Sequence, residues 1–159
     1  MSDAERLHVL IDTESIREVI ARYFFAIGRR DWEAVQACFI AGAFADYEFN
    51  EEKTIERQLA LVKKGMLRFR SSTLLGSNSL IQLHGARAES QTMALTAHEA
   101  QPDANERTRI STVRYEDSWT KQDNGDWLIA RRRVIAVWKA WLDPRYDDRA
   151  GDHRYADEW

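Results

Sequence analysis

The chain has little of several features that place a protein in a class. Among its 159 residues there is one cysteine, Cys38, which excludes an intrachain disulfide and a cysteine-based metal site. No apolar run approaches the roughly 18 residues that a membrane-spanning helix needs. The polar residues 1–6 lead into no apolar signal sequence. We therefore expect a soluble, cytoplasmic protein with no membrane partner.

Charge gives no reason to expect a nucleic-acid partner. The net charge is −3, with 44% hydrophobic and 31% charged residues, an ordinary composition for one globular domain. Residues 131–133 are three arginines, but on a strand the outer two share one face and the middle one points away. Cross-strand carboxylates at Glu89, Glu116 and Asp117 would neutralise the outer two. No metal-ligand spacing, phosphate loop or nucleophile–histidine motif occurs, so we expect neither a metal nor a cofactor.

Residues 108–141 carry the strongest local signal. Two arms, 108–121 and 127–141, are rich in β-branched and aromatic residues, which favour strands. Between them, Asn124-Gly125 favours the positive φ angles of a tight hairpin turn. Upstream, two further segments alternate with a period of two. These are residues 73–83 and 87–100, with a turn at His84-Gly85 between them and a loop at Pro102, Asp103 and Asn105 after them.

The first half of the chain predicts three helices. Asp12 or Thr13 caps the first, which follows a lead-in of residues 1–11 and ends at Gly28, and Asp31 and Asn50 cap the other two. Each carries one apolar stripe at helical spacing. The stripes are Ile16, Val19, Ile20, Tyr23, Phe24 and Ile27, then Trp32, Val35 and Phe39, then Ile55, Leu59, Val62, Met66 and Phe69.

Helices followed by strands predict an α+β fold. The four long antiparallel strands would form a strongly curved, cone-shaped sheet, antiparallel or mixed, with the helices on its concave face. A cavity between the two layers would be a natural ligand site. We expect a single domain over residues 1–142, with the tail 143–159 docking on its own or a partner subunit. Apolar residues of the last strand predict a homodimer packed sheet to sheet, with Ile135, Val137, Trp138 and Trp141 in the interface.

The order of elements and several short motifs resemble the nuclear transport factor 2-like superfamily and, within it, the SnoaL-like group. The resemblance covers roughly residues 12–142. The motifs are residues 16–23, Arg30-Asp31-Trp32, Asp46-Tyr47, residues 75–78 and Trp127-Leu128-Ile129-Ala130-Arg131. This resemblance implies the cone-shaped fold but does not fix a reaction, because the superfamily hosts dehydratases, isomerases, cyclases, epoxide hydrolases and non-catalytic subunits.

The scytalone dehydratases, one family in this superfamily, suggest catalytic positions. By that resemblance, Tyr47 matches a catalytic tyrosine and His98 a catalytic histidine. Other positions depart from the pattern, so dehydration by the same route is not expected. Gly28 replaces an aspartate and Thr73 a histidine of that family's general base, Ile27 replaces a tyrosine, and Arg114 and Glu116 stand where a serine and an asparagine are expected.

The residues themselves leave alternatives open. His98 is the only histidine inside a predicted strand, beside small side chains, and serves either in the pocket or as a hydrogen-bonded structural group. Tyr47 either donates to a ligand oxygen or fills the core. Residues 43–49 alternate as a short strand, which places Asp46 on the face opposite Tyr47 unless the strand bends. Five apolar or aromatic residues are expected in the core, and those among them that also line a cavity would bind substrate. They are Tyr23, Ile27, Met66, Phe69 and Trp119.

Two classes of function fit this reading. One is a cofactor-independent acid/base enzyme, a lyase, isomerase or cyclase, that acts on a hydrophobic, oxygenated or aromatic molecule with His98, Tyr47 and Asp46 as its catalytic candidates. The other is a non-catalytic subunit similar to the β chain of aromatic-ring-hydroxylating oxygenases, which would be a trimer. A ligand-binding module without turnover is a third possibility.

Overall fold

The structure, a computed structural model, describes residues 2–49, 51–101 and 107–142. The predicted loop residues Pro102, Asp103 and Asn105 and the predicted tail 143–159 lie outside this range. The elements, in chain order, are α1 Asp3–Arg29, α2 Trp32–Gln36, β1 Phe39–Asp46, α3 Ile55–Met66, β2 Phe69–His84, β3 Arg87–Ala100, β4 Thr108–Lys121 and β5 Trp127–Leu142. No helix within the described ranges is long and apolar enough to cross a membrane.

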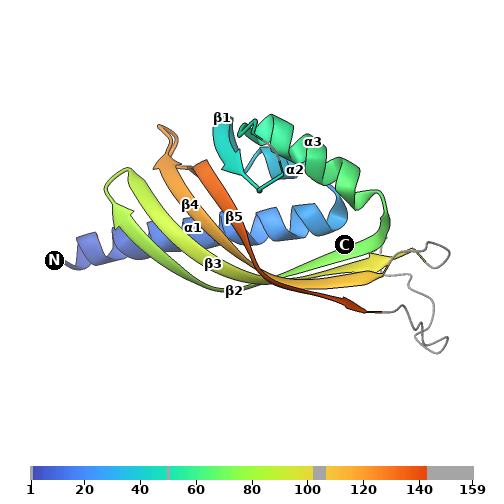
Figure 1. The fold of residues 1–159 in the computed structure, drawn as a ribbon. Coiled ribbons are helices and arrows are strands. Elements are labelled where there is room, and N and C mark those ends of the chain that lie inside the picture. The colour runs from blue at the N-terminus through green and yellow to red at the C-terminus, as the bar shows by residue number, and fades with distance from the viewer. Residues whose placement is uncertain (1, 50, 102–106, 143–159) are drawn as a thin grey trace.

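The sheet has the strand order β1-β5-β4-β3-β2. The four long strands are antiparallel neighbours, and the short β1 adds a parallel edge beside β5. Figure 1 shows the sheet curving around α1, with α3 above its far end. The predicted α+β fold, with N-terminal helices on the concave face of a curved mixed sheet, is therefore confirmed.

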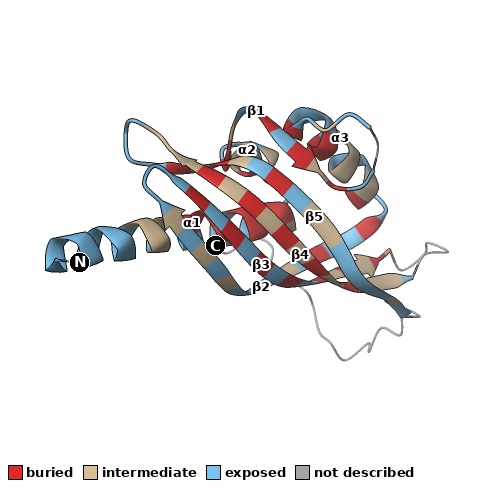
Figure 2. Ribbon diagram, turned by 60° about the vertical axis from the view of Figure 1, so that its left-hand side comes forward, coloured by how far each residue is buried: buried red, intermediate tan, exposed pale blue. Residues whose placement is uncertain are grey.

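Alternation along the strands decides which side chains face the helices. On β3 every second residue from Ala88 to Ala100 is buried, and on β4 the same holds from Ser111 to Trp119. Figure 2 shows these buried positions as red bands across the strands. Because cross-strand partners share a face, the inner face of the sheet runs continuously from β2 to β5.

The first helix begins earlier than predicted. Ser2 caps it in a capping box, its hydroxyl accepting a hydrogen bond from the Glu5 amide at 3.3 Å. The expected lead-in, residues 1–11, is therefore wrong from Asp3 onward. Residues 3–11 are exposed, so they have no buried stripe that could have marked them as helical.

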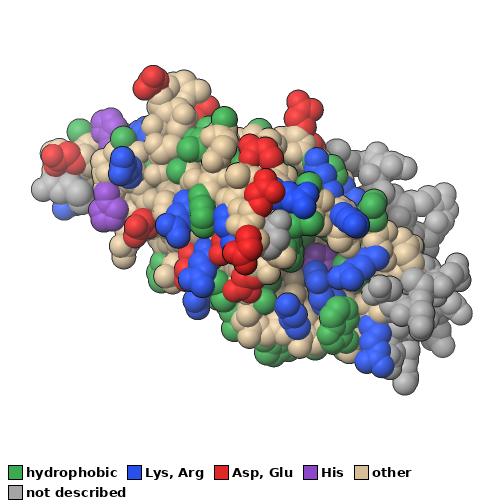
Figure 3. All heavy atoms as spheres, turned by 45° about the horizontal axis from the view of Figure 1, so that its top comes forward, with side chains coloured by type: hydrophobic (Ala, Val, Ile, Leu, Met, Phe, Trp, Pro, Cys, Tyr) green, Lys and Arg blue, Asp and Glu red, His purple; other side chains and the backbone are tan. Residues whose placement is uncertain are grey.

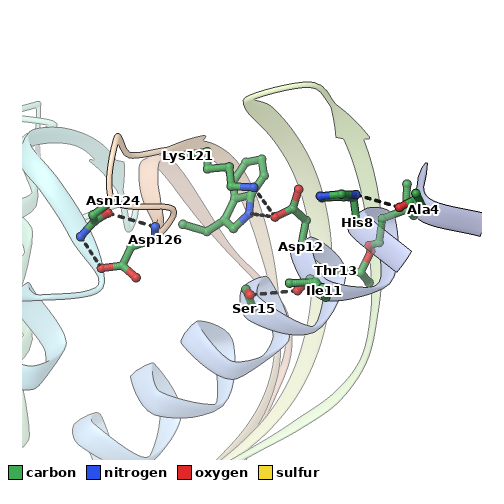
Figure 4. Close-up of polar contacts among 11 residues, drawn as sticks. Ala4, His8, Ile11, Asp12, Thr13, Ser15, Lys121, Asn124 and Asp126 are labelled. Carbon is green, nitrogen blue, oxygen red and sulfur yellow. Dashed lines mark hydrogen bonds and ion pairs between the residues drawn. The ribbon is translucent and has the colours of Figure 1, made fainter. Parts of the chain in front are cut away.

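Asp12 ties the helix to the sheet instead of capping it. Its carboxylate accepts hydrogen bonds from Lys121 Nζ at 2.6 Å and from Trp127 Nε1 at 3.0 Å, at the base of the β4–β5 hairpin (Figure 4). The hydrogen bond from Lys121 lowers the pKa of Asp12, although burial alone would raise it. In the turn, Gly125 has φ +91° while Asn124 stays at negative φ, so the loop is wider than a two-residue turn.

Four other predicted boundaries shift. Phe39 begins β1 instead of ending α2, and β1 stops at Asp46, so Tyr47 lies just beyond it. Thr54 caps α3, because its hydroxyl accepts a hydrogen bond from the Arg57 amide at 3.4 Å; the predicted cap, Asn50, lies outside the described residues. Phe69 is the first residue of β2 and not part of the α3 stripe.

The outer face of the sheet carries an apolar patch made of Leu75, Met93, Leu95, Val137 and Trp138, all of them exposed. Leu75 pairs with Leu95, and Leu95 and Trp138 both pair with Thr112, so the patch crosses four strands. Trp141, which we expected in the interface, pairs instead with Arg109 on the inner face.

A glycine sets the distance between α1 and β2. A Cβ built on Gly76 would lie 2.5 Å from a ring carbon of the buried Phe24. We predict that Gly76→Ala lowers the free energy of unfolding by about 1–3 kcal/mol, because the added methyl group would overlap the Phe24 ring and force it to shift. Gly65→Ala, in the last turn of α3 with no atom within 4 Å of the added Cβ, should instead gain up to about 1 kcal/mol. Urea denaturation measures both, and equal effects would contradict this account.

The outer apolar patch leads us to expect a homodimer in solution. Leu95→Glu places a charge at the centre of the patch and should convert the dimer to a monomer, as measured by light scattering at micromolar concentration. Leu67→Glu, at the exposed C-terminal end of α3, is the control and should leave the mass unchanged. A monomeric wild type would refute the dimer, and a trimer that co-purifies with a larger chain would support the subunit alternative.

Candidate functional site

A cavity of about 770 Å³ lies between α1, α3 and the inner face of the sheet. Its walls are mainly apolar and come from the helices and from all four long strands. This size is within the range of pockets that hold small organic ligands. The apolar lining residues are Ile27, Phe49, Leu61, Val62, Met66, Phe69, Leu74, Val113, Val134 and Ala136.

An ion pair lies buried beneath one wall of the cavity. Arg132 on β5 faces Asp117 on β4, and two parallel hydrogen bonds of 2.7 Å join the guanidinium to the carboxylate. Burial by itself would lower the pKa of Arg132, but the Asp117 carboxylate raises it well above its ordinary value. Arg132 therefore stays charged inside the protein.

Tyrosines cover the arginine on its other sides. The Arg132 guanidinium lies 4.0 Å from the ring centroid of Tyr23 and 4.9 Å from that of Tyr115. Tyr23 and Tyr47 share a hydrogen bond of 2.9 Å between their hydroxyls, and all three rings line the cavity. Burial raises the pKa of each tyrosine, so their hydroxyls are neutral hydrogen-bond donors.

His98 lies on β3 in another wall of the same cavity. Its Nδ1 shares a hydrogen bond of 2.8 Å with the Ser72 hydroxyl on β2, and its ring packs 5.1 Å from that of Phe69. Within residues 2–49, 51–101 and 107–142 no group is hydrogen-bonded to Nε2, which leaves that nitrogen for a ligand. Burial, with Arg109 and Arg68 nearby, lowers the pKa of His98 to about 4, so the imidazole is neutral at pH 7.

The Ser72 hydroxyl is hydrogen-bonded to His98, whereas the resemblance to the scytalone dehydratases implies an aspartate near the catalytic histidine. A Cβ on Gly28 would lie 3.2 Å from the Ser72 carbonyl oxygen, so the position expected to hold an aspartate is next to the His98 partner but has no side chain. In the described part of the chain no carboxylate contacts the imidazole. The ring is therefore oriented by a hydroxyl, which adds no negative charge.

Most of the predicted site residues meet in this cavity, and two do not. Tyr23, Ile27, Tyr47, Met66, Phe69 and His98 line it. Asp46 lies on the other side of β1, where its carboxylate binds Lys53 at 2.7 Å, and this hydrogen bond lowers its pKa. Trp119 is buried below the cavity and donates a hydrogen bond to the Ser90 hydroxyl at 2.9 Å.

Sequence reasoning missed Ser72, Arg68 and Arg109 as site residues. The cross-strand register places Ser72 and Arg109 on either side of His98. Knowing how β2, β3 and β4 pair would have been enough to predict both neighbours. Arg114 and Glu116 pair at 3.0 Å on the half-exposed outer face. The described residues include no cluster of three or more His, Cys, Asp or Glu side chains that would hold a metal ion.

The low pKa of His98 predicts a pH dependence of stability. An unfolded chain binds a proton at this residue below pH 6.5, whereas the folded protein binds it only near pH 4. The contribution is therefore fully present above pH 6.5 and is lost as the pH falls toward 4, up to about 3 kcal/mol. Wild type should lose more stability than His98→Gln between pH 7 and 4.5 in urea denaturation, whereas equal losses would contradict a neutral, buried imidazole.

Comparison with known proteins places this architecture in a family. No curated protein matches the chain. Solved structures include a proposed scytalone dehydratase from Novosphingobium aromaticivorans, 19% identical, covering 86% of this chain and 91% of that one with a TM-score of 0.74. They also include the hexachlorocyclohexane dehydrochlorinase LinA-type3 from Novosphingobium barchaimii, 15% identical, with 91% and 97% covered and a TM-score of 0.74.

A further similar structure is an NTF2-like protein with a cystatin-like fold from Novosphingobium aromaticivorans, 19% identical, with 84% and 87% covered and a TM-score of 0.69. At these identities the likeness establishes the fold alone. The sequence itself matches the family model of the SnoaL-like domain over residues 8–133, which is most of its length. The chain therefore belongs to the SnoaL-like domain family.

Proposed function

We propose that the protein binds a small, largely apolar, oxygen-bearing molecule in the cavity and moves a proton on it. The single observation that carries this proposal is that a neutral histidine and a tyrosine hydroxyl pair line one apolar cavity. His98 accepts the proton through Nε2, and Tyr47 donates a hydrogen bond to the oxygen on which charge develops.

The tyrosine pair delivers a defined hydrogen bond. In the 2.9 Å contact between Tyr23 and Tyr47, one hydroxyl donates and the other keeps its own proton for the ligand. The Arg132 guanidinium lies against the Tyr23 ring, where its charge favours a negative oxygen bound to these hydroxyls. The Asp117 partner holds that charge in place without reaching the cavity, because neither residue of the ion pair lines it.

The weak basicity of His98 limits which protons it can remove. An imidazole with a pKa of about 4 is a poor proton acceptor, so the carbon it deprotonates must already be acidic, for example one flanked by a carbonyl and an aromatic ring. The dehydratase and dehydrochlorinase names of similar structures are compatible with proton abstraction followed by loss of a leaving group. The absence of a carboxylate beside His98, among the described residues, favours a second candidate, ligand binding without turnover.

Hydrogen–deuterium exchange at a ketone tests the proposal without knowledge of the natural substrate. 2-Tetralone has an aromatic body, one carbonyl and acidic benzylic protons next to it. In D₂O near pH 7 the protein should accelerate exchange of these protons, as followed by NMR. His98→Gln should lower the enzymatic rate by about 10²–10⁴-fold, and Tyr47→Phe should lower it as well. Trp119→Phe, outside the cavity, should not.

The outcomes separate the candidates. Binding of 2-tetralone with chemical-shift changes at His98 but no exchange would support the binding module and refute proton transfer. Exchange that is equally fast in all variants would refute the assigned residues. Failure to bind at all, in a cavity of this size and apolar character, would count against both candidates.

A further inference from the structure

The cavity has an unbalanced charge at its rim. Its lining includes the cationic side chains of Arg57, Lys64, Arg68, Arg109 and Lys139, but Glu48 is its only acidic residue within the described ranges. Arg57 is paired with Glu52 at 3.5 Å, outside the lining. The other four cations have no ion-pair partner among residues 2–49, 51–101 and 107–142. Figure 3 shows Lys and Arg side chains gathered on the face that carries α3 and the far ends of the strands.

Two of these cations converge on one aromatic ring. The guanidinium of Arg68 lies 5.0 Å from the ring centroid of Phe69, and that of Arg109 lies 5.3 Å from the same centroid. Phe69 in turn packs against His98. Arg109 also pairs with His98 across the β3–β4 ladder. Both guanidinium groups therefore lie near the imidazole, and close enough to each other for their charges to interact.

Arg109 has a hydrogen-bond donor without an acceptor. Its Nε is buried and has no hydrogen-bond partner in the described part of the chain. Burial lowers the pKa of Arg109, and the neighbouring Arg68 lowers it further. A buried donor without a partner and a repulsion between like charges both destabilise the protein. An anion between the two guanidinium groups would remove both effects, and a carboxylate fits the planar N–H pair of an arginine.

We propose that the natural ligand carries a carboxylate that binds between Arg109 and Arg68 at the rim, with its apolar body inside the cavity. This inference rests on the proposed function of the cavity and specifies its substrate class as aromatic or alicyclic carboxylic acids. The carboxylate would lie at the rim, and the carbon that loses the proton and its neighbouring oxygen would lie between His98 and Tyr47. The ligand is thereby held by its carboxylate at the rim and by its body in the apolar interior.

Ligand binding would also change the histidine. The groups that face His98 are Ser72 on β2, Arg109 on β4, and Arg68 and Phe69 at the junction of α3 and β2. Both arginines disfavour the imidazolium form in the free protein. A carboxylate that pairs with them cancels this effect, so His98 should gain basicity only when the ligand is in place. By linkage, the carboxylate should bind more tightly as the pH falls.

The test compares probes of matched shape. 2-Naphthoate and 2-naphthamide differ in charge but hardly in size, and 2-naphthyl phosphate carries a different anion. Titration calorimetry at pH 7 should show naphthoate binding at least tenfold tighter than naphthamide, which is about 1.4 kcal/mol. NMR should show the His98 pKa rising from about 4 when naphthoate is bound. Arg109→Gln and Arg68→Gln should each remove most of the preference for naphthoate.

Arg114→Gln is the control, because Arg114 is on the same strand as Arg109 but on the outer face, paired with Glu116. It should leave all three affinities unchanged. If naphthamide binds as tightly as naphthoate, the carboxylate inference is wrong and the apolar binding site stands. If the naphthyl phosphate binds best, the anion is not a carboxylate. If none of the three probes binds or perturbs His98, both the inference and the proposed function fail.

Discussion

The buried pair between Arg132 and Asp117 is the interaction on which the rest of the site depends. Two charges enclosed between a helix and a sheet are tolerated because two short hydrogen bonds join them, although Nη1 of Arg132 has no hydrogen-bond partner among the described residues. The tyrosine rings that pack on the guanidinium form one wall of the cavity. Removing the ion pair would therefore disturb both the folding core and the hydroxyl groups that face the ligand.

The cavity has two groups of polar side chains in a mainly apolar lining. Tyr23 and Tyr47, supported by Arg132, offer a hydrogen bond to the ligand. His98, held by Ser72, and the rim arginines form the second group. The charges of the two groups act differently, because Arg132 is neutralised by Asp117 whereas Arg68 and Arg109 are not paired with any described residue. We infer that Arg132 has a fixed partner, whereas Arg68 and Arg109 pair with the ligand when it binds.

Much of the architecture followed from residue patterns, and the site followed only in part. Alternation on β3 correctly placed His98 among inward-facing small residues, and alternation in β1 separated Tyr47 from Asp46. The start of α1 was not predicted, because its first residues carry no buried apolar stripe. Partners of the functional residues depended on strand register, which single-strand patterns do not fix. Asp117 was expected to neutralise the outer arginines, but a register shift between Ser118 and Trp119 accompanies its pairing with the inward-facing Arg132.

Unfolding of two matched variants on β4 tests the central role of the buried pair most directly. Asp117→Asn leaves the Arg132 charge enclosed without its counter-ion and should lower the free energy of unfolding by about 3–5 kcal/mol. Glu116→Gln breaks the half-exposed pair with Arg114 on the adjacent, outward-facing position and should lower it by less than about 1 kcal/mol. Similar small losses in both variants, with the tyrosine signals of Asp117→Asn unchanged in NMR spectra, would contradict the account.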